Sequence, residues 1–292
     1  MLSPVFFRRL AFTTAFFAYL QIALGGVVRV TGSGLGCPDW PLCHGRPYPA
    51  ADVHSIIEYS HRTVGSITGV LVIATVALSW MVFARLRPVV PLLATSSLVA
   101  IAAEGALGGV VVVNELGSWL VLAHLALAMI ILGLLLATAI MSLPASRGKT
   151  VRLAPLAVAG TYILLLTGSA VVASGADNSC RSWPLCAGGF DAITFLHRGA
   201  VLVIGVLIVY VLIQALVSNA SRAVAIATLA VLAVQVAVGA GSALTDNALF
   251  NGLHVGVATL VWAGMLSIAL LAVPRSDRVL ASSRLSVDQR PA

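Results

Sequence analysis

Charged residues are scarce in this chain of 292 residues, of which 9% are Asp, Glu, Lys or Arg. An ordinary soluble domain carries about 25%, so this scarcity excludes a soluble globular protein. Disorder is excluded as well, because 60% of the residues are hydrophobic. The net charge of +7 could indicate nucleic acid binding, but the arginines lie in short breaks between apolar runs and not on one basic face. We expect no nucleic acid partner.

Long apolar runs dominate the sequence instead, and the mean hydropathy is +1.04. A membrane-spanning helix needs about 20 mostly apolar residues. The first run follows Arg8 and Arg9 as in a signal peptide, but no small-residue cleavage site follows it, so we expect a retained span. The fold class predicted is therefore an all-α polytopic membrane protein with eight transmembrane helices. The predicted spans are 10–30, 62–84, 89–113, 119–143, 153–173, 192–217, 223–243 and 252–273.

Basic residues divide unevenly between the two sets of connecting segments. Twelve of the 17 fall in the N-terminus, the alternate breaks 85–88, 144–152 and 218–222, and the tail. The side rich in arginine is expected to be cytoplasmic, which places both termini there. We expect residues 274–292, which are polar and rich in Ser and Arg, to form a disordered cytoplasmic tail. The opposite face holds the other five basic residues: Arg29, Arg46, Arg62, Arg181 and Arg198.

The cysteines form two pairs with the same spacing, C-x5-C, on the side assigned to the outside. Disulfides persist in oxidising compartments, so we predict the links Cys37–Cys43 and Cys180–Cys186. Zinc is the alternative, but structural zinc sites favour closer cysteine spacing and further ligands nearby. His44 adjoins Cys43, while the second pair has no such neighbour. We interpret His44, and His54 in the same loop, as solvated or structural.

The two cysteine motifs also reveal an internal repeat. Residues 37–43 are CPDWPLC and residues 180–186 are CRSWPLC, and later matches follow at similar offsets. We predict two four-helix halves, 1–146 and 147–273, arranged as parallel repeats about an axis along the membrane normal. The matched residues after the cysteines are His61-Arg62 with His197-Arg198, Glu104 with Gln235, and His124 with His254.

Four histidines lie inside or at the start of the predicted spans, one pair in each half: His61, His124, His197 and His254. A single histidine in a membrane span is often only a packing residue, but ionisable groups there usually carry a function. Neutral imidazole is a strong ligand for iron, copper or zinc. Two imidazoles from separate helices suit a haem in a bundle core. We therefore predict one haem site per half.

The halves differ in charge beside these histidines. Glu58 precedes His61 by three residues, so both side chains project from one face of a helix, whereas the second half has Thr194 at that position. Likewise, Arg29 corresponds to Val172. We predict that the first half performs the chemistry and the second relays electrons. The alternative is that Glu58 only complements a helix N-terminus.

The stretch GGVVRVTGSGLGCPDWPLC at residues 25–43, followed by EYSHR at 58–62, resembles heme A synthase. The resemblance covers all eight spans, both cysteine pairs and the four histidines of the spans. It implies an enzyme that oxidises a ring methyl group of heme o to the formyl group of heme A for terminal oxidase assembly.

The resemblance also implies roles for individual residues. His197 and His254 would be the axial ligands of a haem b cofactor in the C-terminal half. The substrate haem would be held by His61 and His124 in the N-terminal half, with Glu58 as the catalytic carboxylate. The pair Cys37–Cys43 would have a redox or gating role, and the pair Cys180–Cys186 would be a brace.

Partners and further contacts follow from the same resemblance. Arg29, Arg62 and Arg198 are candidates to pair with haem propionates, although interfacial snorkelling explains them equally well. The expected partners are heme o, the bilayer of the cell membrane, a membrane electron carrier, heme o synthase and terminal oxidase assembly factors. A homo-oligomer is an open alternative. For Glu104 we favour an interhelical hydrogen-bond partner over a second proton site.

Two other functions explain part of the pattern. A di-haem electron-transfer protein needs the same four histidines but has no use for Glu58, and it would hold two permanent haems. A membrane thiol–disulfide oxidoreductase would use the cysteine pairs, but such enzymes typically carry C-x-x-C. A transporter explains neither the cysteines nor the histidines.

Overall fold

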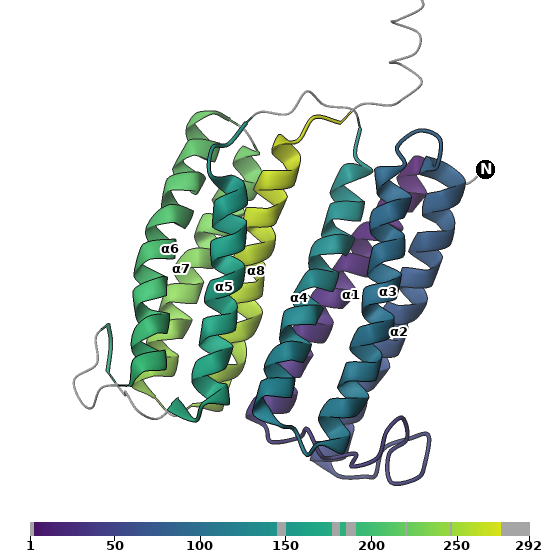
Figure 1. The fold of residues 1–292 in the computed structure, drawn as a ribbon, viewed down its shortest axis with the longest axis vertical. Helices are drawn as coiled ribbons and strands as arrows, with labels where there is room; N and C mark the ends of the chain where they lie inside the picture. Colours follow the sequence, from purple (N-terminus) through teal and green to yellow (C-terminus); the bar gives the residue numbers. More distant parts are fainter. Residues whose placement is uncertain are drawn as a thin grey trace, which may run out of the picture.

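The computed structural model describes residues 3–144, 150–176, 182–184, 191–219, 221–245 and 247–275. All the regular secondary structure of these residues is helical (Figure 1). The predicted link Cys180–Cys186 and nearly all of the predicted disordered tail lie outside the described residues. The helices are α1 (Pro4–Val30), α2 (Val53–Phe83), α3 (Val89–Val113), α4 (Ser118–Met141), α5 (Ala154–Ala173), α6 (Ala192–Val217), α7 (Arg222–Leu244) and α8 (Ala248–Ala272).

Each of these helices is long and apolar enough to cross a membrane. The predicted fold class, an all-α protein with eight candidate membrane spans, is therefore confirmed, and the chain is a multi-pass membrane protein. Helices α3 and α6 begin and end at the predicted residues.

Helix α2 differs most from its prediction, because it begins at Val53 and not at residue 62. The carboxylate of Asp52 accepts the backbone N–H of Ser55 at 2.9 Å and caps the helix. The polar first turns are therefore helical, although hydropathy finds only the apolar part. His61 consequently lies about 12 Å along the helix from its first residue, at about 1.5 Å per residue.

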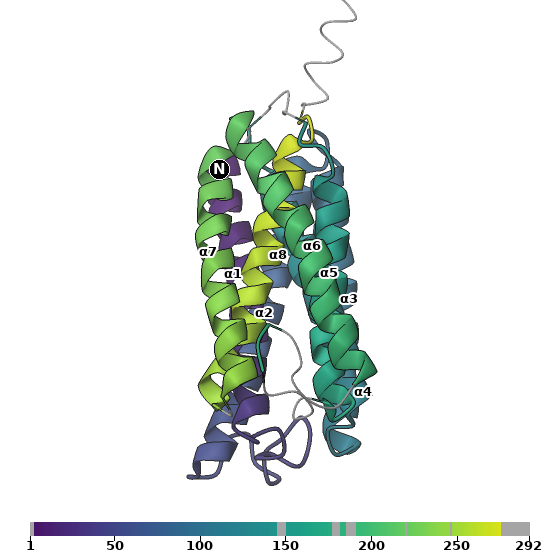
Figure 2. The ribbon, with the colours of Figure 1, turned by 90° about the vertical axis from the view of Figure 1, so that its left-hand side faces the viewer.

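The helices form two groups of four that stand side by side and run along a common direction (Figures 1 and 2). In the first group each helix packs against two others in the cycle α1–α2–α3–α4, and the second group repeats this pattern with α5–α6–α7–α8. Helices α2 and α4 therefore occupy diagonal corners, as do α6 and α8. The start of α1 and the end of α8 lie at one end, and the loop 31–52 lies at the other (Figure 1).

The two groups meet where α1 and α4 pack against α5 and α8. Small residues allow close approach there: a Cβ added to Gly26 of α1 would lie 3.3 Å from the carbonyl oxygen of Gly252 of α8. The Trp262 indole of α8 packs against Gly133 of α4 and donates to the carbonyl oxygen of Val158 of α5 at 3.2 Å. One hydrophobic cluster contains buried residues of both groups, so the spacing between the groups is fixed by packing.

Candidate functional site

Each of the four histidines in the spans lies against a glycine of the preceding helix. A Cβ added to that glycine would approach the Cε1 atom of the imidazole within 3.0–3.3 Å. Because glycine has no Cβ, the edge of each ring rests against the neighbouring helix, which restricts the ring orientation. The pairs are Gly25 with His61, Gly108 with His124, Gly168 with His197, and Gly239 with His254.

The histidines of each half belong to diagonal helices of a four-helix group. His61 lies on α2 and His124 on α4, the diagonal helices of the first group. His197 of α6 and His254 of α8 are related in the same way. The structure therefore places the two pairs that the sequence singled out on opposite corners, each within its own group.

Two of the imidazoles have matched partners in the two halves. Nδ1 of His124 lies 3.1 Å from Oε1 of Glu104, and Nδ1 of His254 lies 3.1 Å from Nε2 of Gln235. The contact of Glu104 with His124 joins α3 to α4, but Nδ1 of His124 has no hydrogen bond among the described residues, so the interhelical hydrogen bond favoured for Glu104 from the sequence stays a prediction.

The other two imidazoles contact polar residues that the sequence analysis missed. Nδ1 of His197 lies 2.9 Å from the hydroxyl of Thr167, and Nε2 of His61 lies 3.2 Å from the amide nitrogen of Gln21. Gln21 lies four residues before Gly25 in the same apolar run, so it shares a face of α1 with the glycine that contacts His61. That spacing is the signal that could have identified Gln21.

Several buried polar atoms near these histidines have no hydrogen-bond partner among the described residues. Such atoms are costly to leave unpaired, and they mark the interior of each group as a place for a polar or metal-bearing ligand. The Thr167 hydroxyl lies at Nδ1 of His197, which leaves Nε2 of that ring for iron. These imidazole donors fit a haem in each half. The unpaired atoms are Nδ1 of His61, Nδ1 of His124, Oε1 of Gln21, Oε2 of Glu104 and Oε1 of Gln235.

The loop 31–52 covers the end of the first helix group and contains the disulfide Cys37–Cys43. The predicted first link is thus present, and it excludes zinc at this pair. Both cysteines are buried, and the ring of Trp40 packs against Gly109 of α3. The carboxylate of Asp39 accepts the backbone N–H of Gly45 at 2.7 Å, which lowers the pKa of Asp39.

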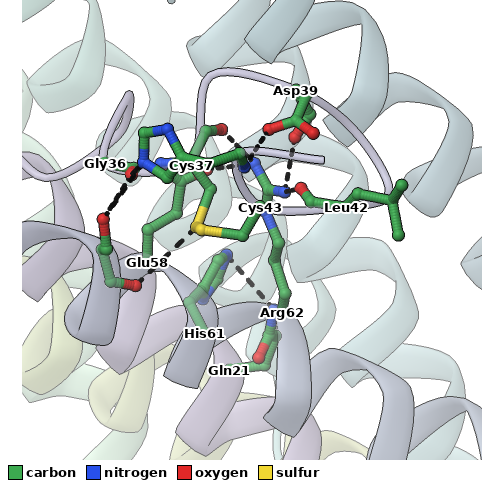
Figure 3. Close-up of polar contacts among 11 residues, drawn as sticks. Gln21, Gly36, Cys37, Asp39, Leu42, Cys43, Glu58, His61 and Arg62 are labelled. Atoms are coloured by element: carbon green, nitrogen blue, oxygen red, sulfur yellow. Dashed lines mark hydrogen bonds and ion pairs between the residues drawn. A yellow bond between two sulfur atoms is a disulfide. The ribbon is translucent and has the colours of Figure 1, made fainter. Parts of the chain in front are cut away.

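Arg62 connects this loop to α2 (Figure 3). One terminal nitrogen of its guanidinium donates to the carbonyl oxygens of Asp39 and Leu42, at 2.7 and 2.6 Å. The other donates to the carbonyl oxygen of Cys37 at 2.7 Å and to Oε1 of Glu58. These four bonds leave only the Nε–H of the five guanidinium donors for a haem propionate.

Glu58 is buried beneath the loop, with 3% of its surface exposed. Its second oxygen accepts the backbone N–H of Cys37 at 2.8 Å, so both oxygens of the carboxylate have partners. Glu58 and His61 lie about one turn apart on α2, but the carboxylate binds the loop and Arg62, and His61 binds Gln21. The structure therefore connects Glu58 to the disulfide more directly than the sequence indicated.

In the second half, the position of Glu58 is occupied by the neutral residue Thr194. The hydroxyl of Thr194 donates to the carbonyl oxygen of Ala176 at 3.3 Å, and Arg198 donates to the carbonyl oxygen of Pro184 at 3.2 Å. Arg29, the third candidate for a propionate, lies exposed in the last turn of α1. The first half therefore has a buried carboxylate bound to an arginine at this position, and the second half has a hydroxyl bound to the backbone.

Replacing Arg62 by lysine is expected to loosen the disulfide loop. A lysine ammonium cannot match the fork of guanidinium donors, so the carbonyl groups of the loop lose partners. We expect faster reduction of Cys37–Cys43 by an added thiol, followed by alkylation and mass spectrometry. Arg46→Lys is the control, because Arg46 lies in the same loop and stacks over Tyr48. Equal reduction rates in the two variants would contradict the role assigned to Arg62.

The same alkylation assay tests the cysteine pairing. In untreated membranes from aerobic cells we expect both pairs to be oxidised, with the links Cys37–Cys43 and Cys180–Cys186. Links between the two loops, or free thiols at Cys180 and Cys186, would show that the prediction for the second pair is wrong.

Comparison with known proteins places these features in a family. The family model COX15-CtaA, described as cytochrome oxidase assembly protein, matches residues 8–55 and 50–266. A heme A synthase of Shouchella clausii is 30% identical over 268 residues, which cover 82% of this chain and 88% of the relative. A heme A synthase of Symbiobacterium thermophilum is 28% identical over 90% of this chain and 94% of its own length. A heme A synthase of Bacillus pumilus is 29% identical over 72% of this chain and 75% of its own length. With nearly all of its membrane helices matched, the chain belongs to the COX15-CtaA family of cytochrome oxidase assembly proteins.

Proposed function

We propose that this protein is a heme A synthase, which oxidises a ring methyl group of heme o to the formyl group of heme A for terminal oxidases. The observation that carries the proposal is the pair of imidazoles on the diagonal helices of each four-helix group, with the buried carboxylate of Glu58 in the first group. The names of the relatives support the same activity.

The two halves have different tasks in this proposal. The N-terminal half, 1–146, binds the substrate heme o through His61 and His124. The C-terminal half, 147–273, binds haem b through His197 and His254. The support for this division is the presence of Glu58 in the first half and of neutral Thr194 at its position in the second. When bound, haem b supplies one-electron transfer.

Oxidation of a methyl to a formyl group removes electrons and protons from the carbon and adds one oxygen atom. Glu58 is the group of the chain assigned to hold or transfer these protons. Arg62 and the backbone N–H of Cys37 fix the position of its carboxylate. Through this contact the disulfide Cys37–Cys43 has a gating role, because opening the loop would withdraw the backbone N–H of Cys37 from Glu58 and the loop carbonyl groups from Arg62.

The orientation in the membrane completes the proposal. The loop 31–52 lies on the extracytoplasmic face of the cell membrane, and both termini are cytoplasmic. The support is the excess of basic residues at the other end of the bundle and the disulfide in this loop. Arg29 and Arg198 then lie at the outer interface, where their guanidinium groups would pair with haem propionates, and a membrane electron carrier accepts the electrons.

Pigment analysis tests the proposed function. The full chain is expressed in a bacterial strain that makes heme o but lacks heme A, and haems are extracted from the membranes and from the purified protein. We expect heme A in the membranes, and one haem b per purified chain with less than one equivalent of heme o or heme A. Two permanent haems of type b without heme A would instead support the di-haem electron-transfer protein. Heme A formation that survives loss of the histidines would contradict haem ligation by them.

A further inference from the structure

We infer that the basic end of the bundle holds a binding site for a phosphate group, in the cavity between Arg87 of the α2–α3 connection and Arg275 just beyond α8. This is the end at which α1 begins and α8 ends (Figure 1). The inference goes beyond the proposed function, because the cavity involves neither the histidines of the spans nor the disulfide loop. The phosphate group belongs either to an anionic phospholipid or to inorganic phosphate in solution.

Three arginines from separate elements converge on the end of α4. Nε of Arg8, Nη1 of Arg87 and Nε of Arg275 each donate to a carbonyl oxygen of residues 141–144, at 2.8, 3.0 and 3.4 Å. The C-terminus of a helix attracts basic side chains because its last carbonyl groups lack partners. This attraction explains the bonds, but it does not explain why two of the guanidinium groups are buried beside one cavity.

The cavity is basic on one side and apolar on the other. Arg87 is 6% exposed and Arg275 is 8% exposed, and both line a cavity of about 240 Å³ together with the apolar side chains of Leu86, Val89 and Met141. Pockets that take drug-sized ligands measure roughly 300–1,000 Å³. This cavity therefore suits a single phosphate group, with the apolar side chains beside the carbon atoms of a lipid, and it is too small for a haem.

Arg275 has charge and hydrogen-bonding capacity to offer such a ligand. Burial and the positive charge of Arg87 lower the pKa of Arg275, since both disfavour a second buried cation. Arg275 forms no ion pair with the described residues, and its bonds to them come from Nε and Nη1. Nη2 therefore remains for a phosphate oxygen, which a guanidinium group binds with well-matched geometry.

The distribution of carboxylates favours an external anion at this end. Asp277 and Asp288 of the tail lie outside the described residues. Basic pockets between membrane helices on the cytoplasmic side bind anionic lipid headgroups, and the proposed orientation puts this cavity on that side. The carboxylates of the described residues lie toward the opposite end of the bundle: Asp39, Asp52, Glu58, Glu104, Glu115 and Asp191.

A phosphate group in this cavity would connect the two halves of the chain. Arg87 belongs to the first half and Arg275 to the second, and the ligand would be a shared counter-ion for both. Because a ligand that binds only the folded protein stabilises it, we expect occupancy of the site to raise the unfolding temperature.

Reconstitution in defined lipids tests the inference. The purified full chain is placed in nanodiscs of phosphatidylcholine with or without phosphatidylglycerol, its unfolding temperature is measured by circular dichroism, and native mass spectrometry counts the retained lipids. We expect phosphatidylglycerol to raise the unfolding temperature and one molecule of it to be retained. In Arg275→Gln and Arg87→Gln its affinity should fall at least about tenfold, because a charged hydrogen bond is lost.

Inorganic phosphate is the second probe, added to phosphatidylcholine nanodiscs at constant ionic strength. If phosphate raises the unfolding temperature, phosphatidylglycerol does not, and Arg275→Gln abolishes the increase, the site belongs to the free ion. If only phosphatidylglycerol acts, the site belongs to a lipid.

Arg85→Gln is the matched control, because it removes an exposed positive charge from the same connection and should behave as the wild type does. Equal losses in Arg85→Gln and Arg275→Gln would show a general effect of surface charge and overturn the inference. So would retention of the full response in Arg275→Gln. If the variants do not fold, the wild type decides, because a protein that responds to neither probe has no such site.

Discussion

Replacing His254 by alanine is expected to remove the tightly bound haem b from the purified protein and to abolish heme A formation. The imidazole is one of the two ligands proposed for this haem, and alanine offers no donor to iron at that place. His197→Ala should have the same effect. Absorption spectra of the purified variants, with haem extraction, measure the loss.

The same substitutions in the first half should have a different result. His61→Ala and His124→Ala are expected to abolish heme A formation while haem b stays bound at full occupancy. His54→Ala is the control, because His54 lies in the first turn of α2 and contacts Ser33 of the loop at 3.0 Å. An unchanged haem b spectrum in both second-half variants would contradict the assignment of the two halves.

Glu58→Gln should prevent heme A formation while haem b is retained. Glutamine keeps the size of the side chain but cannot exchange a proton near neutral pH, and general acid–base catalysis is worth about 10²- to 10⁴-fold in rate. We therefore expect heme A yield to fall by about this factor, with accumulation of heme o or a partly oxidised haem. Extraction of pigments from cells that express each variant measures both quantities.

Two controls separate proton transfer from anchoring of the loop. Arg62→Lys loosens the loop but keeps the carboxylate, so it should lose much less activity than Glu58→Gln; equal losses would assign Glu58 to anchoring alone.

Adding Thr194→Glu to Glu58→Gln should not restore activity, since that carboxylate lies in the other half. A normal heme A yield from Glu58→Gln would show that the first half does not act through this group. If Glu58 only complemented the N-terminal end of α2, Glu58→Gln would lower the stability of the protein by about 0.3–1 kcal/mol and leave heme A formation nearly unchanged.

Hydropathy and repeat spacing were sufficient to predict the eight helices, because apolar runs of this length are stable only across a membrane. They located the ends of α3 and α6, where turns interrupt the apolar pattern abruptly. They failed at the start of α2, because the cap at Asp52 extends the helix through polar residues that a hydropathy average does not detect.

The partners of the site residues were less predictable than the residues themselves. The repeat indicated the four histidines, but the contact of His61 with Gln21 depends on how α1 and α2 are rotated about their axes. Similarly, the spacing of Glu58 and His61 suggested a direct relation between them. The path of the loop, set by Arg62 and the disulfide, instead brings Cys37 to the carboxylate.

The packing of α4 against α8 bears on the rate at which the two proposed haem sites would exchange electrons. On the proposed division of tasks, His124 of α4 would hold the substrate haem and His254 of α8 would hold haem b, and these two helices are direct neighbours. Electron tunnelling slows steeply with distance, and side-chain packing such as that of Trp262 against Gly133 fixes the spacing of the two helices. Transfer between the halves would then need neither a diffusing carrier nor a domain movement.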